Sequence, residues 1–211
     1  FDQHPLTRVR RWLADVVDTI HLEDSVRPEG LADGSSPSTE GTRITQRIPS
    51  SILGQLYLMA GRMDQAEVMF LQSLRLDHGE PADSSAEVAE TLTLLGLVRE
   101  MQGKVDAAEW ALLRAHRMFA ETAGAEDLRS ARAAGHLARV RVCAGRFGEA
   151  EPMVLRVLPI FETQGNDVDV AVTLNDFGLI RQATGAHVEA IALFERAAGH
   201  FEKAEQAQGS P

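Results

Sequence analysis

The chain has 211 residues, enough for one or two domains with a sizeable buried core. Hydrophobic residues make up 44% of it and charged residues 25%, as in ordinary globular proteins. A formal net charge of -10 argues against broad nucleic-acid binding, and no run of 18 apolar residues could cross a membrane. We therefore expect no nucleic-acid partner and no membrane partner. The single cysteine, Cys143, excludes an internal disulfide and fits a cytoplasmic protein.

The first 45 residues predict a helix followed by a loop. Apolar side chains recur at helical spacing within residues 6–22, at Leu6, Val9, Leu13, Val16, Val17 and Ile20. We expect this N-terminal segment, residues 1–22, to cap a following array rather than to belong to a preceding domain. Residues 23–45 are rich in Gly, Ser and Pro and predict a flexible loop. Because the first residue is Phe rather than Met, we expect part of a longer chain.

Four similar segments follow along the chain. They read "LYLMAGRMDQAE" at 56–67, "VREMQGKVDAAE" at 98–109, "VRVCAGRFGEAE" at 140–151 and, more loosely, "IRQATGAHVEAI" at 180–191. Their glycines are Gly61, Gly103, Gly145 and Gly185, at separations of 42, 42 and 40, and an alanine follows each glycine five residues later. This constant register predicts an array of four repeats over residues 46–204.

Each repeat predicts two antiparallel helices. The first helices are expected over 46–60, 85–102, 128–144 and 169–184, and the second helices over 64–77, 105–122, 148–164 and 188–204. Residues 205–211 are expected to be a frayed tail. Pro159 falls inside a predicted helix and is expected to bend it.

The recurring residues have distinct packing roles. The turn glycines suit a left-handed turn that a side chain would hinder. Small residues on the first helices are expected to let the two helices of a pair approach closely. Large residues on the second helices are expected to fill the space between the two helices. The small set is Gly54, Gly96, Ala138 and Gly178, and the large set is Phe70, Leu112, Val154 and Phe194. Phe119, Phe161 and Phe201 share one register and are expected to seal the bases of the helical hairpins.

These residues resemble the tetratricopeptide repeat family. The stretch "ILGQLYLMAGRMDQAEVMF", residues 52–70, carries most of its pattern, including Tyr57. The 42-residue period, "EAEP" at 149–152 and "TLNDFG" at 173–178 resemble the kinesin-light-chain variant in particular. The resemblance implies an all-α fold, a right-handed α-solenoid of antiparallel helix pairs. Arg99, Arg141 and Arg181 depart from the pattern, because they stand where the family prefers Tyr.

The resemblance also implies a partner-binding groove on the concave face, formed by the first helices. Transferring the register residue by residue gives the candidate set Gln55, Met59, Glu90, Thr93, Leu97, Glu100, Met101, Arg132, His136, Arg139, Asn175, Leu179 and Gln182. In the kinesin-light-chain variant, an asparagine at the position of Asn175 hydrogen-bonds the backbone of an extended peptide. A solvated or packing asparagine is the alternative, since the other repeats have Ser51, Thr93 and Gly135 there.

Two arginines in the third repeat support two hypotheses. Arg132 and Arg139 are seven residues apart on one helix face, with His136 between them. They suit an anchor for carboxylates of a partner, by bidentate guanidinium pairing. The alternative is that they pair with Glu90 and Glu100 of the neighbouring repeat. A chaperone-type carboxylate clamp is disfavoured, because the first repeat lacks the necessary Lys and Asn.

Other candidate chemistry is sparse. Met59 and Met101 suit either an adaptable apolar strip or the core, and we favour the core. Cys143 is expected to be an inert buried thiol. The seven histidines form no metal-ligand pair, and no phosphate-binding or nucleophile motif occurs. We therefore expect no catalytic residues, no metal and no cofactor, and the chain is not expected to be an enzyme.

The leading hypothesis is a non-catalytic protein-binding module, a scaffold that holds a peptide or helix in its concave groove. Such arrays often belong to larger signalling or regulatory proteins. One alternative is a ligand-sensing regulatory domain that encloses a small molecule, and another is a self-association scaffold. A loop segment, residues 28–45, could itself fill the groove.

Overall fold

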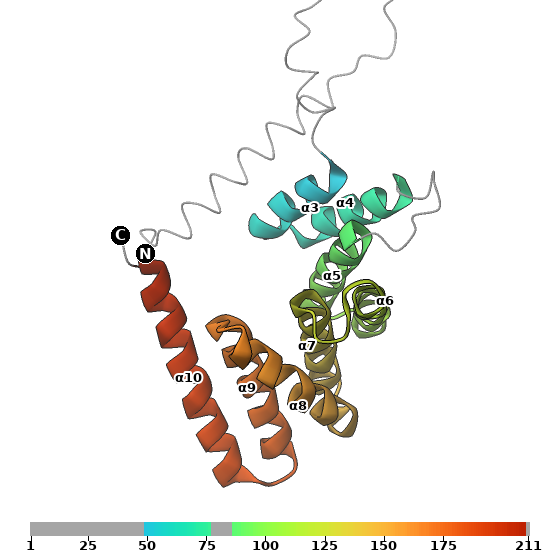
Figure 1. Ribbon diagram of the computed structural model, residues 1–211. Coiled ribbons are helices and arrows are strands. Elements are labelled where there is room, and N and C mark those ends of the chain that lie inside the picture. The colour runs from blue at the N-terminus through green and yellow to red at the C-terminus, as the bar shows by residue number, and fades with distance from the viewer. Residues whose placement is uncertain (1–48, 77–85, 210–211) are drawn as a thin grey trace, which may run out of the picture. The chain divides into compact units, whose positions relative to one another are not determined.

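The computed structural model describes residues 49–76 and 86–209. The predicted N-terminal helix and the loop of residues 23–45 lie outside these residues. The chain divides into two compact units, residues 1–81 and 82–211, which we describe separately. All regular structure in the described residues is α-helical, as predicted (Figure 1).

The helices form consecutive pairs. The first unit contains α3 (Ser50–Met59) packed on α4 (Met63–Leu76). The second unit contains α5 (Ala86–Met101), α6 (Val105–Ala123), α7 (Leu128–Cys143), α8 (Phe147–Thr163), α9 (Asp167–Ala183) and α10 (His187–Gly209). Within it, α6 packs on α7 and α8 on α9, and α7 also contacts both α5 and α9 (Figure 1). The second unit is thus an α-solenoid whose first helices, α5, α7 and α9, follow one another.

The predicted helix boundaries that fall within the described residues agree with these elements to within a few residues, with one exception, and residues 46–48 of the first predicted helix lie outside them. The last helix continues to Gly209, so the frayed tail expected from residue 205 is helical up to that residue. The helix α8 contains both Pro152 and Pro159 and continues to Thr163.

The turn glycines have the conformation that the sequence predicts. Gly61, Gly103, Gly145 and Gly185 have φ angles of 78°, 73°, 72° and 83°. Each turn makes the two hydrogen bonds of a Schellman motif: at the first, Gly61 N–H donates to Leu58 O at 3.0 Å and Arg62 N–H donates to Tyr57 O at 2.9 Å. A left-handed residue closes each helix here, which explains why glycine recurs at this position.

The small residues on the first helices lie directly against large residues on the second helices. A Cβ atom at Gly96 would lie 2.5 Å from Leu112, and one at Gly178 would lie 2.5 Å from Phe194. In the α7–α8 pair the corresponding residues are Ala138 and Val154, which pack in one cluster. Valine is smaller than the leucine and phenylalanine of the other two pairs, and it leaves the space that the methyl group of Ala138 fills. The sizes of the residues at the two positions therefore compensate each other.

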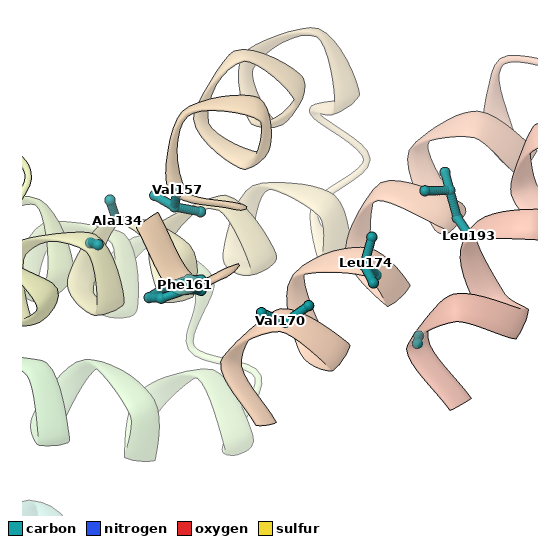
Figure 2. Close-up of a cluster of buried hydrophobic side chains, with 8 residues drawn as sticks. Ala134, Val157, Phe161, Val170, Leu174 and Leu193 are labelled. Carbon is teal, nitrogen blue, oxygen red and sulfur yellow. The ribbon is translucent and has the colours of Figure 1, made fainter. Parts of the chain in front are cut away.

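Successive repeats share one core. The largest cluster joins Ala131 and Ala134 of α7, Val157 and Phe161 of α8, Val170 and Leu174 of α9, and Leu193 and Ala197 of α10 (Figure 2). Phe119 and Phe161 are buried as predicted, each 2% exposed, but Phe201 is 42% exposed. The prediction for Phe201 is wrong because α7 and α9 follow the first two phenylalanines, whereas no helix of the described residues follows α10.

Candidate functional site

The predicted groove residues occupy the first helices. In the second unit they lie on α5 (Glu90, Thr93, Leu97, Glu100, Met101), α7 (Arg132, His136, Arg139) and α9 (Asn175, Leu179, Gln182). Since α7 packs against both α5 and α9, these eleven residues belong to three neighbouring helices. The other two, Gln55 and Met59, are exposed on α3 in the first unit.

The solvent-open residues include apolar ones. On α9, Asn175, Leu179 and Gln182 are all exposed and lie on one helix face at spacings of four and three. Met59 is 58% exposed and Met101 is 56% exposed. The preference for a core role of these methionines is therefore wrong. Each is the last residue of its helix, beyond the residues that the helix buries.

Arg139 is held by the preceding repeat. Its Nε donates to Oε1 of Glu100 at 2.5 Å, and its Nη2 donates to Oε2 at 2.7 Å. The Arg139 side chain is 24% exposed and that of Glu100 14%, so the bidentate pair is largely shielded from water. This geometry confirms the alternative of pairing with Glu100. Arg139 is already occupied and is not a free anchor.

His136 lies next to this pair and is neutral. Its Nδ1 is 3.1 Å from Nη2 of Arg139, which can only donate, so Nδ1 accepts. Burial, and then the positive charges of Arg139 and Arg132, lower the pKa of His136 to about 4. At neutral pH the ring therefore offers one Nε2–H donor and no positive charge.

Arg132 is the more available of the two arginines. Its Nε donates to Oδ2 of Asp169 on α9 at 2.7 Å, and its side chain is 44% exposed. The alternative of pairing with Glu90 is wrong for Arg132, because Glu90 lies 4.0 Å from Arg129 instead. An exposed ion pair contributes little to stability, so its arginine is free to exchange partners.

Sequence reasoning missed one group, the carboxyl of Asp176. Asp176 is 3% exposed, and burial raises its pKa to about 7 against the opposing charge of Arg139. It lines a cavity of about 20 Å³ between α7 and α9 together with Arg132, Gly135, His136, Arg139, Phe161, Asp169, Val172 and Thr173. The repeat pattern does not mark this residue, because the equivalent positions in the two preceding repeats are Leu94 and His136, which are not acidic.

The remaining candidates give no reactive centre. Cys143 is exposed, so the expected buried thiol is wrong. Partial desolvation of the thiol, and then Glu100 and Asp176, raise its pKa, which favours the protonated form. Within the described residues no group of three His, Cys, Asp or Glu side chains is arranged to hold a metal ion. No helix among those residues is both long and apolar enough to cross a membrane.

Comparison with known proteins agrees with this architecture. The tetratricopeptide repeat model matches residues 46–121, 87–163 and 129–203. Since these matches cover more than half of the chain, the chain belongs to the tetratricopeptide repeat family. Repeats of this kind generally mediate protein–protein interaction, and their proteins are generally non-enzymatic scaffolds. No curated protein sequence gives a significant match.

Solved structures give the same fold at low sequence identity. BtubC (BKLC) from P. vanneervenii has a TM-score of 0.66 and 19% identity, with 99% of this chain and 95% of that chain covered. A putative kinesin light chain with nearly identical TPR-like repeats from Podosopora anserina has a TM-score of 0.57 and 17% identity over 94% and 88%. MamA has a TM-score of 0.57 and 18% identity over 98% and 99%. The similarity to kinesin-light-chain repeats predicted from the sequence is confirmed at the level of fold.

Proposed function

We propose that this chain is a protein-interaction module that binds an extended peptide or a helix across the first helices of its second unit. The observation that carries the proposal is the row of exposed residues on α9, Asn175, Leu179 and Gln182. On α5, Leu97 is half-buried and Met101 is exposed, and α7 lies between these two helices. A solvent-open face that mixes apolar and amide groups suits a peptide.

The polar groups on α7 determine which partner chemistry fits. Arg132 is the exchangeable cation at this face, because its ion pair with Asp169 is exposed. Arg139 instead orients Glu100 and His136. A partner carboxylate would take the place of Asp169 on Arg132. Asn175 would donate to and accept from the partner backbone.

A small-molecule sensor is less well supported at this face. The cavity between α7 and α9 has a volume of about 20 Å³, which is room for about one water molecule. Pockets for small molecules typically measure about 300–1,000 Å³. The polar cavity therefore fits a bridging water among Arg139, Asp176 and Thr173 better than a ligand.

Selection from a displayed peptide library tests the proposal. Peptides enriched on the parent chain are measured against a face variant, Arg132→Ala/Asn175→Ala/Leu179→Ala. A control variant removes the same chemical groups from the second helices and their ends, Arg114→Ala/Leu155→Ala/Gln164→Ala, all of which are exposed. We expect the face variant to lose at least tenfold in affinity, about 1.4 kcal/mol, and the control to bind like the parent. Equal binding by both variants would move the site to another surface.

A further inference from the structure

The second helices α6 and α8 each present one row of four residues to the repeat that follows. On α6 the row is Glu109, Leu112, His116 and Phe119, and on α8 it is Glu151, Val154, Leu158 and Phe161. The spacing of three, four and three residues places each row along one side of its helix. The two rows are equivalent, since they are 42 residues apart.

The row on α6 is fully used by α7. Oε1 of Glu109 accepts from Nη2 of Arg141 at 3.0 Å, and Leu112 clusters with Leu137 and Val140. Nδ1 of His116 lies 3.0 Å from the hydroxyl of Ser130. The guanidinium of Arg129 stacks 5.3 Å from the centre of the Phe119 ring.

The row on α8 is used in the same way by α9. Nη2 of Arg181 donates to Oε1 of Glu151 at 2.5 Å, and Val154 clusters with Ile180. Phe161 packs in the cluster that contains Leu174 (Figure 2). Leu158 is partly buried and packs against the same cluster. Two of the arginines at the tyrosine positions of the family pattern, Arg141 and Arg181, therefore take part in contacts between repeats.

The equivalent row on α10 is Ile191, Phe194, Ala198 and Phe201, and the described residues contain no helix that covers it. Ile191 is 58% exposed and Phe201 42% exposed. The ion-pairing glutamate of the earlier rows is replaced here by isoleucine, which makes the row apolar throughout. Burying such a row against a helix removes apolar surface from water.

We propose that this row binds the segment of residues 6–22 as an antiparallel amphipathic helix. The segment carries the same spacing, at Leu6, Val9, Leu13 and Val16, so two apolar rows of equal length would interlock. In each earlier interface the helix that covers the row also runs antiparallel to the helix that presents it.

Charge favours this occupant over a second copy of α10. Glu195 and Glu202 are exposed, and each directly follows a phenylalanine of the row on α10. In the segment of residues 6–22, Arg10 directly follows Val9. In an antiparallel pair such flanking positions face each other, so Arg10 meets a glutamate of α10. Two copies of α10 would instead bring glutamates together, which is unfavourable.

Disulfide cross-linking in the full-length chain tests this pairing. In a Cys143→Ser background, Ala198→Cys is combined with Val16→Cys or with Val9→Cys, which covers two registers of the helix pair. The control pairs carry Lys203→Cys instead, an exposed site on the other side of α10. We expect a several-fold higher disulfide yield for a pair with position 198 than for its control. The mass of the product shows whether the segment comes from the same chain or from a second copy.

Two results would overturn the pairing. One is an equal yield for the pairs and their controls. The other is a disulfide between two copies of position 198 in the variant that carries only Ala198→Cys, which would identify a second α10 as the occupant. A second experiment needs no engineered cysteines. It compares the rate at which trypsin cleaves after Arg10 and Arg11 in two variants of α10, because a segment bound to α10 is cleaved more slowly than a free one. Phe201→Asp is expected to accelerate this cleavage several-fold. Val188→Asp changes a residue that is 83% exposed and outside the row, and it is expected to leave the cleavage rate unchanged. Equal cleavage rates in the two variants would also overturn the pairing.

Discussion

The helices α8 and α10 hold equivalent places in their repeats, and the surroundings of their shared residues differ. Phe161 of α8 is 2% exposed between its own repeat and α9, whereas Phe201 of α10 is 42% exposed. The same residue type at the same register is therefore core in one repeat and surface in the next. The comparison shows that the burial of a residue on a second helix depends on whether another repeat follows it.

The largest expected effect comes from removing the two phenylalanines in turn. Phe161→Ala is expected to destabilise the chain by about 3–5 kcal/mol, because it leaves a cavity among α7, α8 and α9. Phe201→Ala is expected to cost much less, since its ring already contacts water. Urea unfolding monitored by circular dichroism measures both. Equal losses would mean that the two phenylalanines have like surroundings, which would contradict the difference between α8 and α10.

Close packing within the pairs gives the next effect. Gly178→Ala is expected to cost about 1–3 kcal/mol, because the new methyl group would overlap the Phe194 ring. Adding Phe194→Val reproduces the Ala138 and Val154 combination of the α7–α8 pair and is expected to recover part of the loss. A double-mutant cycle measures this coupling, and strictly additive effects would contradict the paired-volume explanation.

Burial between repeats also changes the titration of the Asp176 carboxyl. The pKa of Asp176 is raised to about 7 from an ordinary value near 3.8, so its stabilising contribution is present at acid pH and is lost as the pH rises towards 7. His136 acts in the opposite sense, because its lowered pKa of about 4 makes stability rise between about pH 4 and 6.5. The two contributions partly cancel in the parent chain.

Replacing one of the two groups reveals its contribution. For Asp176→Asn, the gain in unfolding free energy relative to the parent is expected to grow from about pH 4 to 7 and to stay level above that range. Urea titrations across this range measure the difference. A pH-independent difference for Asp176→Asn would show that the carboxyl is not buried as described.

The ion pairs between repeats give the smallest effect. Glu151→Ile introduces into α8 the residue type that α10 has at the equivalent position. Since Glu151 and Arg181 are partly exposed, the loss is expected to be at most about 1 kcal/mol and to shrink at high salt. Thermal unfolding at two salt concentrations measures it. A large, salt-independent loss would indicate that this pair is part of the core.

The sequence predicts what depends on local register and leaves open what depends on neighbours. The positive φ of Gly103 and the contact of Gly96 with Leu112 follow from spacing alone, because both lie within one helix pair. Exposure of Phe201 and Met101 does not follow, since it depends on which surface the next element covers. The buried carboxyl of Asp176 is set by Arg139 and Glu100 of two other repeats, so no local pattern marks it.

The central claim is that a partner binds across α5, α7 and α9, and a co-crystal structure with the tightest selected peptide tests it most directly. We expect a peptide that contacts Asn175 and Leu179 and places an acidic group against Arg132. A peptide seated on the second helices, with Asn175 and Leu179 still open to solvent, would contradict the claim.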